Sequence, residues 1–154
     1  MIVKGKYILT DPSDPDEDVL RDSAIYIEGN KIREIGPFSK LKEKYQNSRV
    51  VGGDNVLISP GLIDAHSHGR GLSPLRGGLD YDHLEPWLSQ TSLIPSPEKY
   101  LNSAYSALKH IRSGITGVNY VHIPPYPKPN SKLLFEEAIK GYREVGIRLS
   151  AGLS

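Results

Sequence analysis

Short apolar runs, broken by turn residues, dominate the first 58 residues and predict strands rather than long helices. Gly29-Asn30 separates two alternating segments, which favours a hairpin with a two-residue turn. The expected elements are strands over residues 2–10, 23–28, 31–35, 50–51 and 55–58 and a short helix over 38–45. Residues 1–58 are therefore expected to form a small β domain.

The pattern changes from residue 59 onward. The apolar run around Leu62 and Ile63 is bounded by glycines and is typical of a strand buried on both faces. Two segments at helical spacing follow, with Ser96 and Ser131 as expected N-caps and Gly114 as the expected end of the first. Their expected core faces are Tyr100, Leu101, Ala104, Tyr105, Leu108 and Ile111 in the first, and Leu134, Phe135, Ala138, Ile139, Tyr142 and Val145 in the second.

Strands expected over residues 115–121 and 147–151 complete the order strand, helix, strand, helix, strand over 59–154. Such an order predicts an α/β fold with parallel strands and right-handed crossovers.

Composition narrows the classes of partner. The chain has 154 residues, a net charge of +1 and no cysteine. The near-zero charge argues against nucleic acid as a partner, and no apolar run is long enough for a membrane-spanning helix. The absence of cysteine excludes thiolate metal ligands and the cysteine-ligated zinc deaminases, and it makes a cytoplasmic location the expectation.

His66 and His68 are the candidate metal ligands. They follow the apolar run at spacing i, i+2, so with Asp64 they are expected on one face of the strand. Imidazoles at that spacing can converge on one metal ion, although a strand histidine is also commonly a packed core residue. His122 has two open interpretations, as an ordinary loop histidine or as a residue lining a pocket.

Two other segments are expected to be loops. The acidic residues 11–18 begin like a calcium loop, but Val19 replaces the required glycine and Ile25 the closing acid, so a solvated loop is expected. The four prolines between His122 and Asn130 predict a stiff extended loop.

The segment from Pro60 to His68, Pro-Gly-Leu-Ile-Asp-Ala-His-Ser-His, resembles the first barrel strand of the metal-dependent amidohydrolase superfamily. Leu75–Gly78 and Asp82–Leu88 resemble the segment that follows it in the cytosine deaminase and chlorohydrolase-like branch. The resemblance implies that His66 and His68 ligate a divalent metal ion, zinc in first place and iron as the alternative. It also implies hydrolysis of a carbon–nitrogen bond of a small-molecule substrate, by deamination or amide cleavage.

The resemblance also implies a domain plan. Residues 1–58 would belong to a partial β-sandwich, and residues 59–154 would supply the first strands and helices of a (β/α)8 barrel. The family's other metal ligands lie on later strands, so we expect an N-terminal fragment that is inactive alone, and we assign no catalytic residue. The alternatives are a non-catalytic fragment that forms homo-oligomers through open sheet edges, and a hydantoinase-type or dipeptidase-type cyclic amide hydrolase.

Overall fold

The computed structural model describes residues 1–10, 19–80, 83–91, 93, 97–123 and 130–153. The acidic segment 11–18, the expected cap Ser96 and the prolines of 124–129 lie outside the described residues. The chain divides into two compact units, Met1–Pro60 and Gly61–Ser154, which we describe separately. The division falls two residues after the expected boundary at residue 58.

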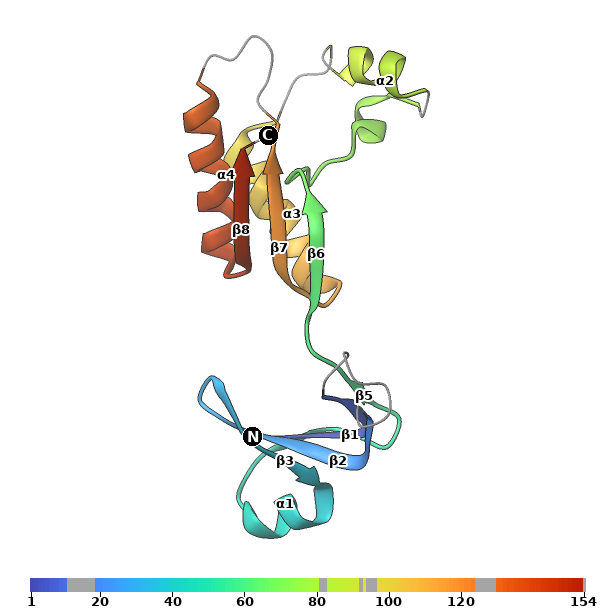
Figure 1. Cartoon of the computed structure of the whole chain (residues 1–154), viewed down its shortest axis with the longest axis vertical. Coiled ribbons are helices and arrows are strands. Elements are labelled where there is room, and N and C mark those ends of the chain that lie inside the picture. The colour runs from blue at the N-terminus through green and yellow to red at the C-terminus, as the bar shows by residue number, and fades with distance from the viewer. Residues whose placement is uncertain (11–18, 81–82, 92, 94–96, 124–129, 154) are drawn as a thin grey trace. The chain divides into compact units, whose positions relative to one another are not determined.

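The first unit is built on one mixed sheet (Figure 1). Its strands are β1 (Ile2–Leu9), β2 (Val19–Glu28), β3 (Lys31–Pro37), β4 (Val50–Gly52) and β5 (Leu57–Ile58). The order is β3-β2-β1-β4, and β5 also pairs with β1. Strands β1, β2 and β3 are antiparallel, whereas β4 and β5 run parallel to β1. The predicted hairpin is confirmed, with Gly29 at a φ of +59° in its turn.

Helix α1 (Phe38–Lys44) packs against this sheet and closes a small core. Leu41 of the helix is buried against Ile2 and Ala24. Tyr26 and Tyr45 stack nearby, with their ring centroids 3.6 Å apart. The described strands of this unit thus form one sheet covered by a helix, and the β-sandwich stays a prediction.

The second unit is a three-stranded parallel sheet with helices, which confirms a mixed α/β fold. Its strands are β6 (Leu62–Ser67), β7 (Ile115–His122) and β8 (Arg148–Leu153), in the order β6-β7-β8. The helices are η1 (Pro74–Gly77), α2 (Leu84–Thr91), α3 (Lys99–Arg112) and α4 (Ser131–Val145). Helices α3 and α4 lie on one side of the sheet (Figure 1) and share its core, made of Ala107, Val118, Tyr120, Ala138, Tyr142 and Ile147.

The expected core face of α4 is confirmed, because Ala138 and Tyr142 are fully buried and Phe135 packs against the same core. The expected cap at Ser131 is wrong. Ser131 is the first helical residue, and the cap is Asn130, which has a φ of +63° and makes no side-chain capping bond. The start of α3 also differs, since its N-cap is Glu98.

The expected core face of α3 is wrong. Leu101 and Leu108 are 58% and 50% exposed, and Tyr105 and Ile111 are exposed as well. The buried residues of α3 are small instead: Ser103, Ser106 and Ala107. The reason is the close approach of α4, where a methyl group on Gly141 would lie 2.7 Å from the Tyr100 carbonyl oxygen. Helices this close together have room only for small side chains between them.

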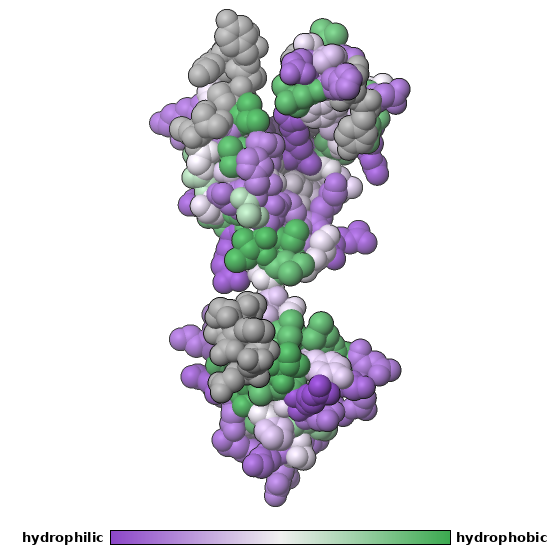
Figure 2. All heavy atoms as spheres, turned by 45° about the vertical axis from the view of Figure 1, so that its right-hand side comes forward, coloured by the Kyte–Doolittle hydropathy of each residue, from purple (hydrophilic) through white to green (hydrophobic). Residues whose placement is uncertain are grey.

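The expectation that the strand around Leu62 is buried on both faces is also wrong. Leu62 is 59% and Ile63 is 75% exposed. Within the described residues β6 pairs with β7 only, so it is an edge strand. A space-filling view shows apolar patches on the surface of each unit (Figure 2). No helix in the described part of the chain is long and apolar enough to cross a membrane.

Candidate metal centre

The two candidate ligands lie at the carboxyl end of β6 and point toward each other. His66 is in the strand, and His68 follows its last residue, Ser67. Their Nε2 atoms are 3.1 Å apart, and the rings meet edge to face with centroids 4.7 Å apart. Two nitrogens that each lie about 2.0–2.1 Å from a tetrahedral zinc ion are separated by about 3.3 Å. The pair therefore fits two positions of such a site, while metal binding itself stays a prediction.

The ring of His68 is oriented by a second strand. Its Nδ1 lies 3.0 Å from the backbone oxygen of Val121 in β7. A carbonyl oxygen only accepts hydrogen bonds, so Nδ1 carries the proton. The lone pair of the neutral ring is then on Nε2, the atom that faces His66. Metal-binding histidines are commonly oriented by a hydrogen bond of this kind.

Asp64 does not join the two histidines, contrary to expectation. Its Oδ2 lies 3.1 Å from Nε2 of His110 in α3, and its Oδ1 accepts a hydrogen bond from the backbone N–H of His66. The pairing of β6 with β7 shifts register between Asp64 and Ser67, which interrupts the regular alternation of faces. Among the described residues, no group of three or more acidic, histidine or cysteine side chains is placed to hold a metal ion.

His122 is not a loop histidine, because it is the last residue of β7 and is almost fully buried. Its Nδ1 makes a 2.8 Å hydrogen bond with the hydroxyl of Tyr120. Burial, and then the charge of Lys99, lower the pKa of His122, so the neutral ring is favoured. Burial raises the pKa of Tyr120. This buried pair supports the end of β7, the same strand whose backbone orients His68.

Lys99, in the first turn of α3, lies beside this buried pair, although it was not among the site residues expected from the sequence. Its Nζ lies 5.3 Å from the centre of the Tyr120 ring. Burial, and then repulsion from Arg70, lower its pKa to about 8. Its position in the sequence could have indicated a lowered pKa, because a lysine at a helix N-terminus lies at the positive end of the helix dipole.

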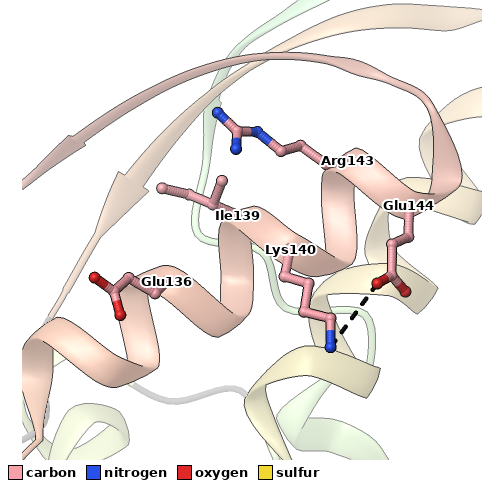
Figure 3. A pocket seen from close by; sticks show the side chains of 5 residues that line it. All are labelled: Glu136, Ile139, Lys140, Arg143 and Glu144. Atoms are coloured by element: carbon pink, nitrogen blue, oxygen red, sulfur yellow. Dashed lines mark ion pairs between the residues drawn. The ribbon is translucent and has the colours of Figure 1, made fainter.

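Neither His66 nor His68 lines the two surface hollows described here. One follows the outside of α4 and is lined by Glu136, Ile139, Lys140, Arg143 and Glu144 (Figure 3). All five come from one helix, and Lys140 forms an i, i+4 ion pair with Glu144. Such a solvated helix face presents no set of converging reactive groups. A second hollow lies on the sheet, over Ile63, Asn119 and Arg148 among others.

The chain is similar to known proteins over most of its length. The model of the amidohydrolase family matches residues 57–153. The chain is 31% identical to a 5'-deoxyadenosine deaminase of Methanosarcina barkeri, over 75% of the chain and 26% of that protein. It is 26% identical to a 5-methylthioadenosine/S-adenosylhomocysteine deaminase of Thermodesulfovibrio yellowstonii, over 98% of the chain and 33% of that protein.

Solved structures show the same relationship. A mutant atrazine chlorohydrolase from Arthrobacter aurescens, complexed with zinc and atraton, superposes with a TM-score of 0.62 and 25% identity, over 98% of the chain and 35% of that protein. A guanine deaminase of Escherichia coli, at 19% identity and a TM-score of 0.63, shares the fold. The chain thus spans about a quarter to a third of the length of these relatives. Because the family model covers more than half of its residues, the chain belongs to the amidohydrolase family.

Proposed function

We propose that this chain supplies two metal ligands, His66 and His68, to a hydrolase that cleaves carbon–nitrogen bonds. The observation that carries the proposal is the convergence of the two Nε2 atoms, 3.1 Å apart, with His68 oriented by Val121. We favour zinc, because tetrahedral zinc matches this separation and one similar structure holds zinc. Deamination is the favoured reaction, since the relatives named above include deaminases of adenosine derivatives.

A bound divalent metal would supply Lewis-acid polarisation of the substrate and activation of water at neutral pH. The residues of this chain would orient that metal: His68 through its bond to the Val121 carbonyl of β7, and His66 through the bond that its backbone N–H donates to the Asp64 side chain. A catalytic zinc ion usually takes three protein ligands. The described residues present two, so the proposal requires further ligands from other parts of the whole protein, and the sheet β6-β7-β8 would be part of its barrel.

Zinc binding by the chain tests the proposal directly. We expect weak but specific binding, detected as zinc-dependent shifts of the His66 and His68 ring signals in NMR spectra. The double substitution His66→Ala and His68→Ala removes both ligands and should abolish zinc binding, measured for both proteins by isothermal titration calorimetry. His83→Ala is the matched control, because it removes a histidine that precedes α2 and leaves the pair intact. Equal zinc affinity in the double variant and the wild type would refute the ligand assignment.

The exposed apolar residues of β6 favour a second candidate, a non-catalytic chain that self-associates. Ile63 is 75% exposed on a strand that pairs on one side within the described residues. Unpaired strand edges with apolar side chains favour pairing with a second copy. Sedimentation should then show a concentration-dependent dimer that Ile63→Lys weakens. A monomer at all concentrations would contradict this candidate.

A further inference from the structure

The first histidine of the pair lies in an irregular part of β6. Asp64 pairs with Val118 and Ser67 with Tyr120, so β6 advances by three residues (67 − 64) while β7 advances by two (120 − 118). The extra residue is a β-bulge, which interrupts the regular ladder and redirects side chains. Backbone groups within a bulge need other hydrogen-bond partners.

Side chains supply those partners here. The N–H of His66 donates to Oδ1 of Asp64 at 3.1 Å, and the carbonyl oxygen of Ala65 accepts from Nδ2 of Asn119, also at 3.1 Å. The conformation that brings His66 toward His68 is therefore held by two side chains rather than by the ladder alone.

Asp64 is in turn held by His110. Its Oδ2 lies 3.1 Å from the His110 Nε2, and both side chains are largely shielded, at 26% and 15% exposure. A carboxylate only accepts, so Nε2 of His110 carries the proton in either charge state of the ring. The ring lies nearly parallel to that of the fully buried Tyr142, at 6.2 Å between centroids, so His110 is anchored against the core.

We propose that His110 is a positioning residue for the metal centre, acting on His66 through Asp64. The inference rests on the proposed function, since it takes His66 as a ligand. Without His110, the Asp64 carboxylate is free to turn toward solvent, and the His66 N–H loses a fixed acceptor. Loss of a group that orients a metal ligand typically lowers metal affinity by about 10- to 100-fold.

Two substitutions of similar size separate hydrogen bonding from packing. His110→Leu fills the space without a donor, whereas His110→Gln retains an N–H that can reach the carboxylate. We expect zinc affinity of the whole chain, titrated by NMR, to fall about tenfold or more in His110→Leu. Affinity in His110→Gln should stay within about threefold of wild type. Without zinc, the His66 amide signal should shift in His110→Leu and stay near its wild-type position in His110→Gln.

A double-mutant cycle adds a readout that a packing role would not produce. Asp64→Ala removes the intermediate acceptor, so adding His110→Leu to it should cost no further zinc affinity. If His110→Leu alone folds poorly, His110→Ala takes its place in the cycle, because it also removes the donor.

Three results would overturn the inference: unchanged zinc affinity in His110→Leu, equal loss in the Leu and Gln variants, or additive losses in the cycle. If wild-type chain binds no zinc while the His66 amide still responds to Leu and not to Gln, the proposed function fails and the positioning role stands.

Discussion

Gly141 is the point at which the packing of α3 against α4 can be tested most sharply. A methyl group there would lie 2.7 Å from the Tyr100 carbonyl oxygen and 2.8 Å from the Ala104 backbone nitrogen. Both are backbone atoms of α3, so neither can move aside without displacing the helix. In an open helix, Gly→Ala stabilises by about 0.5–1 kcal/mol. Overpacking of a closely packed interface costs about 1–3 kcal/mol.

We therefore expect Gly141→Ala to lower the free energy of unfolding by about 1 kcal/mol, the difference between the midpoints of these two ranges. For a domain of this size, 1 kcal/mol shifts the melting temperature by about 4–8 °C. Circular dichroism during thermal and urea unfolding measures the change. Gly152→Ala is the control, since a methyl group at Gly152 meets no atom within 4 Å. A Gly141→Ala variant at least as stable as wild type would refute the close helix contact.

Three further predictions concern the same unit. Leu108→Lys on α3 should change the free energy of unfolding by less than about 0.5 kcal/mol, because Leu108 is exposed; a loss above 2 kcal/mol in urea unfolding would show that the side chain is buried. Tyr120→Phe should cost about 1 kcal/mol or more in urea unfolding, because it leaves Nδ1 of buried His122 without its hydroxyl partner; a neutral effect would contradict that hydrogen bond. Because the pKa of His122 is lowered in the folded protein, the unfolded chain binds the proton first as the pH falls below about 6.5. Stability that is present above this pH is therefore lost as the pH falls toward the lower pKa of the folded protein. Unfolding measured from pH 8 to 5 should therefore show a decline that His122→Gln reduces, and equal slopes in the two proteins would count against it.

The sequence predicted the order of strands and helices better than it predicted which side chains are buried. Helix α4 follows its apolar stripe, with Ala138 and Tyr142 in the core. Helix α3 has an equally regular stripe, yet it buries Ser103, Ser106 and Ala107 instead. Hydrophobic period alone cannot decide such a case, because the buried face depends on how closely another helix approaches. That approach is set by Gly141, more than 30 residues further along the chain.

For the candidate site, too, one expectation from the sequence was correct and another was wrong. The spacing of His66 and His68 correctly predicted that their rings converge, because residues two positions apart are close neighbours along the chain. The same reasoning failed for Asp64, because the bulge breaks the alternation on which it depends. The contact between Asp64 and His110 joins residues 46 positions apart (110 − 64), and no local pattern reports it.

The hydrogen bond from His68 to Val121 has a consequence for mutagenesis. The acceptor is a main-chain oxygen, which every amino acid at position 121 would provide. An alanine scan would therefore score Val121 as dispensable and overlook its part in orienting the ring. An amide-to-ester replacement at the bond joining Val121 to His122, introduced by semisynthesis, would instead weaken that oxygen as an acceptor and leave both side chains unchanged.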